Sequence, residues 1–333
     1  MTQNHPHRQE IRPLPAGALR PLWSVMVPTY NCAAYLRETL ASVLAQDPGP
    51  ETMQIEVIDD CSSDNPQAIV EELAPERVAF HRQPQNVGHV RNFNTCIDRS
   101  RGHLVHVLHG DDAIRDSFYR TMQQPFHDHP EIGAAFCRYI STDASGNWET
   151  IGSLEPGGRG ILDGWLGRIA LGQRLQTPCM VVRRSVYEWL GGFDARLAHC
   201  EDWEMWTRIA ANFPVWYEPD PLALYRVHSG SSSGKSRRIG ENVVDLRRAI
   251  EINRELLPPE SADELSARAL EITAVTAIRR AGPMLQAGDE AAARAQVREA
   301  LKTSRSPAVL ERLAFFAVLW LRHQVKRLRR GTR

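Results

Sequence analysis

The feature that most constrains the fold is a regular alternation of short apolar runs with amphipathic helical segments near the start of the chain. The runs at 23–31, 53–60, 77–81 and 103–112 are typical of buried strands, and the segments between them place apolar residues at helical spacing. Strands that alternate with helices predict βαβ units and a mostly parallel sheet with right-handed crossovers. We therefore expect an α/β fold in which a Rossmann-like sheet is sandwiched between helices.

A polar cluster follows each predicted strand. An Asp pair in isolation would most simply cap the next helix, because Asp accepts hydrogen bonds from free backbone N–H groups. In parallel α/β sheets, however, ligands bind at the carboxyl ends of the strands. Clusters far apart in the sequence should then meet on one rim, which independent caps would not require. The clusters are Thr29–Asn31, Asp59–Asp60, Gln85–Asn86 and Asp111–Asp112.

The acidity of this rim distinguishes it from the common phosphate-binding loops. No GxGxxG follows the first strand and the chain has no GxxxxGK[ST], so neither a dinucleotide-dependent dehydrogenase nor a P-loop phosphotransferase is favoured. Carboxylates repel phosphate, and a divalent cation is the natural bridge between them and a diphosphate. The clusters therefore favour a metal-assisted nucleotide site.

The composition excludes some partners. The 333 residues are 42% hydrophobic, enough to bury a real core, and 40 basic residues balance 40 acidic ones. A chain without net charge has no global field that would attract nucleic acid or a membrane. The 6 cysteines form no CxxC pair and are typical of reduced thiols in a cytoplasmic protein.

We divide the chain into three parts. Residues 1–21 are polar and rich in proline, without the apolar core of a secretion signal, and are expected to form a flexible leader. Residues 22–238 form the α/β domain. Residues 239–333 form a C-terminal helical region, in which breaks at 282–283 and 287–288 predict an antiparallel hairpin or small bundle. No stretch has the ~20 apolar residues that a membrane-spanning helix needs.

The last segment, residues 307–333, concentrates Leu, Phe and Trp and then becomes basic. One interpretation is an interfacial helix that contacts an anionic membrane surface. The other is a helix buried in the bundle with a solvated basic end. The sequence leaves both open. The basic residues are Arg322, Lys326, Arg327, Arg329 and Arg330.

Motifs along the chain together resemble those of the family 2 glycosyltransferases, which have the GT-A fold. They are SVMVPTYN, VIDDCSSD, NVGHVRN, HGDD, GGFD, EDWEMWTRIA and YRVHSGSSS, and they cover roughly residues 22–235. Their joint order is far more specific than any one motif.

The resemblance implies a nucleotide-sugar site and a role for individual residues. Asp60 matches the carboxylate that contacts the base, usually uracil. Asp111 and Asp112 match the acidic pair that handles the ribose and the metal-bound diphosphate, with Mn²⁺ or Mg²⁺ as cofactor. Asp202 matches the catalytic base of inverting members, although an acidic residue in a first helical turn is commonly a favourable helix-dipole charge. The other implied donor-binding residues are Pro28, Thr29, Tyr30, Asn31, Asn86, Arg91 and Arg226.

Two histidines bear on the metal site. The family's frequent pattern is Asp-x-Asp-Asp, whereas this chain has His109 at the first position. Imidazole ligates Mn²⁺ but carries no negative charge when neutral, so we expect Asp111 and Asp112 to hold the ion. His228 is expected over the diphosphate as a further ligand or hydrogen-bond donor, and Arg226 beside the phosphate charge.

The resemblance implies an inverting hexosyltransferase that uses a UDP- or dTDP-sugar, in polysaccharide or glycoconjugate biosynthesis. Sugar transfer to a hydroxyl requires a base for the acceptor proton and a cation for the departing diphosphate. The acceptor would be a glycan, a lipid-linked molecule or a small molecule, met in the cytoplasm or at the inner face of the membrane, and a homodimer is one arrangement of the chain. Nucleic acid is not an expected partner.

Two alternatives remain. A non-catalytic sugar-nucleotide-binding protein of the same fold would have no need of the base Asp202. A nucleotidyltransferase also uses acidic pairs, but it normally has a basic phosphate-binding loop near the first strand, and PTYNCAAYLRE is poor in cations.

Overall fold

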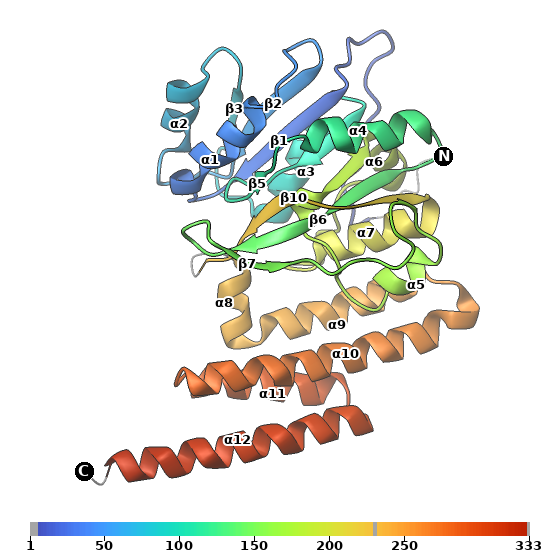
Figure 1. Cartoon of the computed structure of the whole chain (residues 1–333). Coiled ribbons are helices and arrows are strands. Elements are labelled where there is room, and N and C mark those ends of the chain that lie inside the picture. The colour runs from blue at the N-terminus through green and yellow to red at the C-terminus, as the bar shows by residue number, and fades with distance from the viewer. Residues whose placement is uncertain (1–5, 229–231, 332–333) are drawn as a thin grey trace. The chain divides into compact units, whose positions relative to one another are not determined.

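The computed structural model describes residues 6–228 and 232–331, and its first half has the predicted alternation (Figure 1). Four strands lie in the order β3-β2-β1-β4, with every neighbouring pair parallel. All positions of β1 and β2 are buried, as expected for central strands of a parallel sheet. The elements are β1 (Trp23–Thr29), α1 (Ala33–Leu44), β2 (Met53–Asp59), α2 (Pro66–Leu73), β3 (Ala79–Arg82), α3 (His89–Arg99) and β4 (Leu104–Val107).

The second half of the sheet is mixed. The strand β9 is antiparallel to both β4 and β6, and the main order is β3-β2-β1-β4-β9-β6-β10-β5, with β7 on β6 and β8 on β10. Helices flank the sheet, so the expected α/β fold class is confirmed (Figure 1). The elements are β5 (Ala113–Ile114), α4 (Phe118–Asp128), β6 (Ala134–Thr142), β7 (Trp148–Ile151), β8 (Gly160–Ile161), α5 (Trp165–Ile169), the 3-10 helix η1 (Thr177–Cys179), β9 (Met180–Arg183), α6 (Arg184–Leu190), α7 (Glu201–Asn212) and β10 (Val215–Arg226).

Residues 8–11 of the predicted leader contact the α/β fold. Ile11 is fully buried, and Arg8 forms an isolated β-bridge with Asp194. The N–H of Gly192 donates to the carbonyl of Gln9 over 2.8 Å. The expectation of a flexible leader is therefore wrong for these residues, because a single buried Ile and backbone pairing leave no periodic pattern in a polar segment. Residues 1–5 lie outside the described part of the chain.

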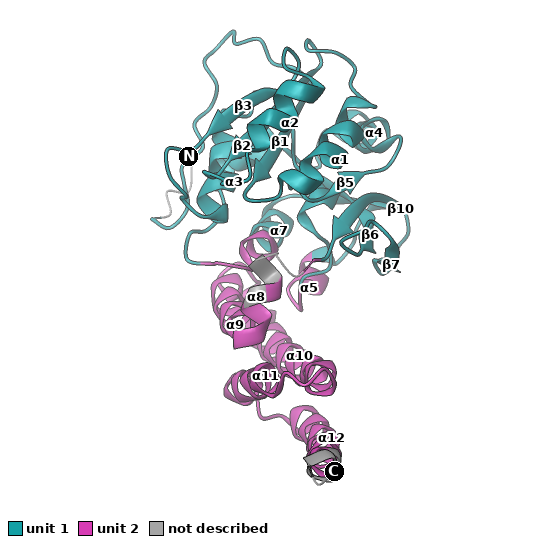
Figure 2. Cartoon of the chain, turned by 90° about the vertical axis from the view of Figure 1, so that its left-hand side faces the viewer, with its two compact units in different colours: residues 1–165, 173–196, 205–227 teal, residues 166–172, 197–204, 228–333 magenta. Residues whose placement is uncertain are grey.

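Contacts divide the chain into two compact units (Figure 2). Unit 1 comprises residues 1–165, 173–196 and 205–227. Unit 2 comprises residues 166–172, 197–204 and 228–333. We expected the helical region to begin at 239, whereas the C-terminal segment of unit 2 begins at 228, and the unit also takes in two short segments from the middle of the chain.

Unit 2 contains a small helical bundle, as predicted. Its elements are α8 (Ser232–Ile239), α9 (Glu241–Arg254), α10 (Pro259–Gln286), α11 (Glu290–Thr303) and α12 (Pro307–Gly331). The predicted break at 282–283 is absent, because α10 continues through Pro283 to Gln286. Proline removes one helical hydrogen bond, but Ile278, Ala281 and Leu285 on either side of it pack in the bundle core and offset that loss.

Helix α12 packs through one face only. Val309 and Phe316 are buried in the core of the bundle, whereas Leu310, Val318 and Leu321 are exposed. Of the helices that the structure describes, α12 included, none is both long enough and apolar enough to cross a bilayer. The side chains of Lys326, Arg329 and Arg330 lie outside the described residues.

Candidate nucleotide-sugar site

The turn that carries the acidic pair lies against the carboxyl end of β1. The N–H of Gly110 donates to the carbonyl of Pro28 over 3.0 Å. A Cβ at Gly110 would lie 2.9 Å from Oγ1 of Thr29 and 3.0 Å from Sγ of Cys32, closer than normal contacts. Glycine at this position therefore allows the turn to approach the strand end, as the rim predicted from the sequence requires.

Asp112 is fixed within this turn. Its side chain is buried, and Oδ1 accepts a hydrogen bond of 2.9 Å from the N–H of Arg226 at the end of β10. Its carbonyl accepts a hydrogen bond of 2.6 Å from Oγ1 of Thr39 on α1. Elements far apart in the sequence thus hold one carboxylate in place.

The other oxygen of Asp112 differs from Oδ1 in its surroundings. Among the described residues, no group donates a hydrogen bond of normal geometry to the buried Oδ2, which lies 3.4 Å from Nδ1 of His109. His109, Asp111 and Asp112 each offer an atom to a cluster whose members lie within 4.8 Å of one another. A divalent cation with oxygen and imidazole ligands, such as Mn²⁺, fits this set of groups.

The electrostatics of Asp112 also favour a cation. Burial raises the pKa of Asp112 to about 6, an increase that His109 opposes and the neighbouring charge of Asp111 reinforces. The ring of His109 stacks on Phe93, with ring centroids 4.9 Å apart, which fixes the imidazole beside the carboxylate. A positive ion at this position would favour the ionised form of Asp112.

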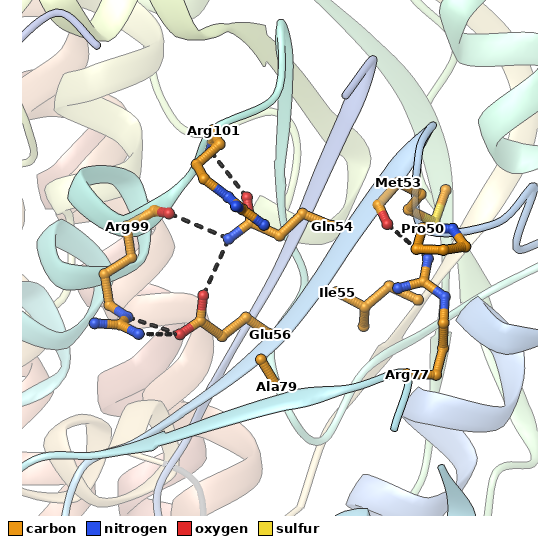
Figure 3. Close-up of a pocket in the computed structure, with 9 residues that line it drawn as sticks. All are labelled: Pro50, Met53, Gln54, Ile55, Glu56, Arg77, Ala79, Arg99 and Arg101. Carbon is orange, nitrogen blue, oxygen red and sulfur yellow. Dashed lines mark hydrogen bonds and ion pairs between the residues drawn. The ribbon is translucent and has the colours of Figure 1, made fainter. Parts of the chain in front are cut away.

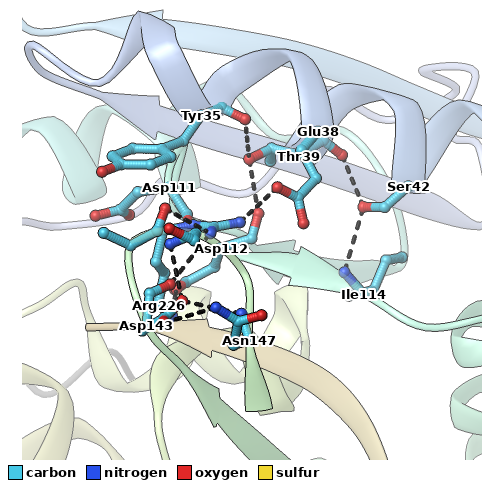
Figure 4. A network of polar contacts seen from close by, with 12 residues as sticks. Tyr35, Glu38, Thr39, Ser42, Asp111, Asp112, Ile114, Asp143, Asn147 and Arg226 are labelled. Atoms are coloured by element: carbon cyan, nitrogen blue, oxygen red, sulfur yellow. Dashed lines mark hydrogen bonds and ion pairs between the residues drawn. The ribbon is translucent and has the colours of Figure 1, made fainter. Parts of the chain in front are cut away.

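Arg226 connects three parts of the site (Figure 4). Its Nε donates to the carbonyl of Asp111 over 3.0 Å. Its Nη1 donates to the carbonyls of Asp143 and Ala144, each over 3.3 Å, in the turn between β6 and β7. The guanidinium therefore holds the acidic turn and the β6–β7 turn in a fixed relation.

The same guanidinium reaches helix α1. Its Nη2 lies 2.5 Å from the carboxylate of Glu38, and its centre lies 4.8 Å from the ring centroid of Tyr35 (Figure 4). Arg226 is only 5% exposed, and the carboxylate of Glu38, which also belongs to unit 1, compensates its charge. The sequence did not single out Glu38, Tyr35 or Asp143, and no local pattern marks them, since only the tertiary fold brings them to Arg226.

Asp60 organises a second part of the rim. Its two carboxylate oxygens accept hydrogen bonds from the N–H groups of Val87 and Gly88, over 2.7 and 3.0 Å. Burial raises the pKa of Asp60, and these two donors counteract part of the increase. The carboxylate thus fixes the NVGH turn that precedes α3, and each oxygen keeps a further lone pair.

The remaining predicted donor residues lie at the end of β1 and around the start of α3. Asn31 accepts a hydrogen bond from the N–H of Ser63 over 2.8 Å, and its own N–H donates to Oγ of Ser62 over 2.9 Å. Tyr30 is 52% exposed, and Asn86 and Arg91 are also exposed. Pro28 and Thr29 are buried, so they contribute backbone and position more than accessible surface.

Two predicted residues belong to unit 2. Asp202 lies in the first turn of α7, is 8% exposed, and its Oδ1 accepts a hydrogen bond of 2.7 Å from the N–H of Trp203. His228 follows β10 and is partly buried. Residues 229–231 of the predicted flexible loop lie outside the described residues.

A pocket of about 540 Å³ lies at the opposite end of the strands, lined by the starts of β2 and β3 (Figure 3). Three of its charged side chains form ion pairs: Arg99 with Glu56 over 2.5 Å, and Arg77 with the neighbouring Asp47 over 2.5 Å. Ligands of α/β sheets bind at the carboxyl ends of the strands, so this pocket is not the expected donor site.

Comparison with known proteins identifies the class. Residues 24–191, half of the chain, match the model of glycosyl transferase family 2, and the chain belongs to this family. An uncharacterised glycosyltransferase of Mycoplasma pneumoniae, the MG025 homolog, is 32% identical over 224 residues, which are 64% of this chain and 70% of that protein. The family expected from the motifs is therefore confirmed.

Two solved structures share the fold. Residues 1–349 of S. aureus TarS in complex with UDP-GlcNAc have a TM-score of 0.55 and 17% identity, covering 84% of this chain and 91% of that TarS chain. The mannosyltransferase PcManGT from Pyrobaculum calidifontis, in complex with GDP-Man and Mn²⁺, has a TM-score of 0.57 and 19% identity, covering 92% of this chain and 83% of PcManGT. The GT-A type of fold is thereby confirmed.

Proposed function

We propose that the chain is an inverting, metal-dependent hexosyltransferase that takes its sugar from a UDP- or dTDP-sugar. The observation that carries the proposal is the buried Asp112 oxygen, which faces the cluster of His109 and Asp111 at the carboxyl ends of the strands. Such an oxygen is costly unless a cation or a donor reaches it. UDP-GlcNAc on TarS and GDP-Man with Mn²⁺ on PcManGT are consistent with a nucleotide-sugar donor, and the first of them with a UDP-sugar.

The donor would lie along the rim of unit 1. Asp60 would accept a hydrogen bond from the base with its remaining lone pairs, as uracil or thymine N3–H requires. The residues that would contact the nucleoside are Tyr30 and Asn31 after β1, and Asn86 and Arg91 around the start of α3. Arg226 would act mainly by holding the acidic turn, because its guanidinium is already bonded to three carbonyls and Glu38.

Asp111 and Asp112 would hold the ion, with His109 and His228 as further candidate ligands. When bound, Mn²⁺ or Mg²⁺ supplies a Lewis acid that stabilises the charge of the diphosphate. The chain itself would contribute a fixed position of Asp112, because hydrogen bonds from Thr39 on α1 and Arg226 on β10 hold this residue in the structure.

Asp202 would act as the general base. It would accept the proton of the acceptor hydroxyl as that oxygen attacks the anomeric carbon and the bond to the nucleoside diphosphate breaks. A single displacement inverts the anomeric centre, so an α-linked donor would give a β-linked product. General bases typically contribute about 10² to 10⁴ in rate.

Replacing the base tests this function. We expect Asp202→Asn to lower turnover by about 10² or more while the affinity for UDP with Mn²⁺ stays within about twofold, because the amide cannot accept the proton. Turnover is measured as nucleoside diphosphate released from the donor, and affinity by calorimetry. A variant that retains most of its turnover would remove Asp202 from this role.

The alternative is a non-catalytic binding protein of the same fold, which the substitution of His109 for the family's frequent Asp favours. Wild-type chain that binds a sugar nucleotide but transfers no sugar to any acceptor, water included, would support that alternative.

For the location, we propose that α12 contacts the inner face of a membrane. Its outer face carries Leu310, Val318, Leu321 and Val325, and Arg322 beside them is exposed. An apolar stripe flanked by basic residues is typical of a helix that lies on an anionic bilayer. A lipid-linked acceptor in polysaccharide or glycoconjugate biosynthesis would be met at such a surface.

A further inference from the structure

The segment that carries the proposed base is built on the helical unit. Residues 197–204, which include Asp202, belong to unit 2 with the helices α8 to α12 (Figure 2). The resemblance to other family members ends at about residue 235, so their motifs do not explain which of these helices supports the segment.

The support comes from Asp245 on α9. Its carboxylate accepts hydrogen bonds from two consecutive backbone N–H groups, that of Ala198 over 3.1 Å and that of His199 over 2.7 Å. Asp245 is 8% exposed, so these charge-assisted bonds form largely out of water, where such bonds are strongest. They fix the turn that leads directly into α7.

The other side of the base is also anchored within unit 2. The N–H of Glu204 donates to the carbonyl of Cys200 over 3.0 Å and so closes the first turn of α7 around Asp202. The side chain of Trp203 is fully buried, and its Nε1 donates to the carbonyl of Ile169 over 2.7 Å. Asp202 therefore lies between two fixed points, one of which depends on α9.

Cys200 lies in the same acidic surroundings. Burial raises the pKa of its thiol well above the usual value, and the negative charges of Asp245, Asp202 and Glu201 add to the increase. The thiol therefore stays neutral and is not a nucleophile in this turn.

We propose that Asp245 is a positioning residue for catalysis, which holds the backbone turn of residues 198–199 so that Asp202 is presented in its reactive position. This inference rests on the proposed role of Asp202 as general base. A displacement of about 1 Å in a catalytic group can lower the rate by about 10². Without the Asp245 carboxylate, the two N–H groups would lose their acceptor and the turn would relax.

The simpler role for Asp245 is stability alone, and a matched variant separates the two. Glu299 on α11 is also buried in unit 2 and forms ion pairs with Lys302 over 2.8 Å and with Arg247 on α9 over 3.6 Å, but it contacts no residue of the 197–204 segment in the hydrogen bonds described. Glu299→Ala should thus weaken the bundle to a similar degree and leave the turn intact.

The experiment compares Asp245→Ala, Asp245→Asn and Glu299→Ala with wild type in the full-length chain. Turnover is measured as nucleoside diphosphate released from UDP-GlcNAc, UDP-glucose, dTDP-glucose and GDP-mannose with Mn²⁺. Affinity for UDP with Mn²⁺, the melting temperature, and hydrogen exchange of the peptide that spans residues 197–204 are measured on the same samples.

We expect kcat of Asp245→Ala to fall by about 10- to 100-fold, with donor KM and UDP affinity within about twofold of wild type. Hydrogen exchange in the 197–204 peptide should rise in this variant only. Asp245→Asn keeps one acceptor oxygen and should recover most of kcat, and Glu299→Ala should retain the kcat of wild type.

Folded Asp245→Ala with kcat within about twofold of wild type would overturn the inference. So would an equal loss of kcat in Glu299→Ala, because that result would assign the effect to stability. If instead Asp202→Asn keeps its turnover, or wild type releases no nucleotide from any of the donors, the proposed function itself fails, and this inference fails with it.

Discussion

Asp112 illustrates the free-energy cost of burying a carboxylate oxygen that accepts no hydrogen bond of normal geometry within the described part of the chain. Its carboxyl group is buried, its pKa is about 6, and one of its oxygens accepts no hydrogen bond of normal geometry from the described residues. A carboxylate in such surroundings destabilises the ligand-free fold at neutral pH, because the charged form is disfavoured by burial.

Replacing this charge should stabilise the metal-free protein. The pKa of Asp112 is raised from 3.8 to about 6 in the folded state. The stability that its bound proton contributes is complete below about pH 4 and is lost as the pH rises through 6. In EDTA at pH 7.5, Asp112→Asn should therefore be more stable than wild type by up to about 3 kcal/mol, and the difference should vanish near pH 4. Urea unfolding across this pH range measures it, and a variant less stable than wild type at pH 7.5 would contradict the expectation.

Gly110 sets the position of the acidic turn. Gly110→Ala places a methyl group 2.9 Å from Oγ1 of Thr29, so the turn must shift, at a cost of about 1–3 kcal/mol. We expect Mn²⁺-dependent UDP binding to weaken with it. Gly167→Ala is a matched control, because no atom lies within 4 Å of the added Cβ. Equal UDP affinity in the two variants would mean that the turn tolerates the displacement.

The helices and strands show why some elements are predictable and others are not. The strands β1 and β2 end at Thr29 and Asp59, and Asp111 follows β4 after a short turn, so the largely apolar runs and the polar residues after them both mark strand ends. By contrast, β5 and β8 have two residues each, too few for any periodicity, and are strands because β10 offers them an edge. The long helix α10 continues through Pro283 because packing outweighs the local preference of proline.

Helix α12 has features of both interpretations that its sequence left open. One face is buried in the bundle and the other is apolar and exposed, with Leu321 at 64%. If the exposed face binds a membrane, Leu321→Asp should reduce sedimentation with phosphatidylglycerol vesicles at least fivefold and leave the melting temperature unchanged. Leu154→Asp is the control, because Leu154 is similarly exposed on unit 1. Unchanged vesicle binding, or a dimer that Leu321→Asp dissociates, would contradict a membrane role.

In the molecule as a whole, the sequence predicts the acidic rim better than it predicts the residues that position the candidate site. Asp60, Asp111 and Asp112 follow strands, and the ends of parallel strands meet, so their common edge could be inferred. Glu38, Asp143 and Asp245 lie in a helix, a turn and another helix, and their roles depend on tertiary contacts that no local spacing encodes. The helical region likewise proves to include the segment of the proposed base.

The most direct test is the thermal shift of wild type and Asp112→Ala with UDP, dTDP and GDP, each with Mn²⁺ or with EDTA. A ligand at 100 times its Kd stabilises the folded state by about 2.7 kcal/mol. We expect one nucleotide, UDP or dTDP, to raise the melting temperature of wild type by several degrees with Mn²⁺ and much less with EDTA, and Asp112→Ala to lose this difference. A shift independent of metal, or one that Asp112→Ala retains in full, would contradict a metal-assisted donor site at the acidic turn.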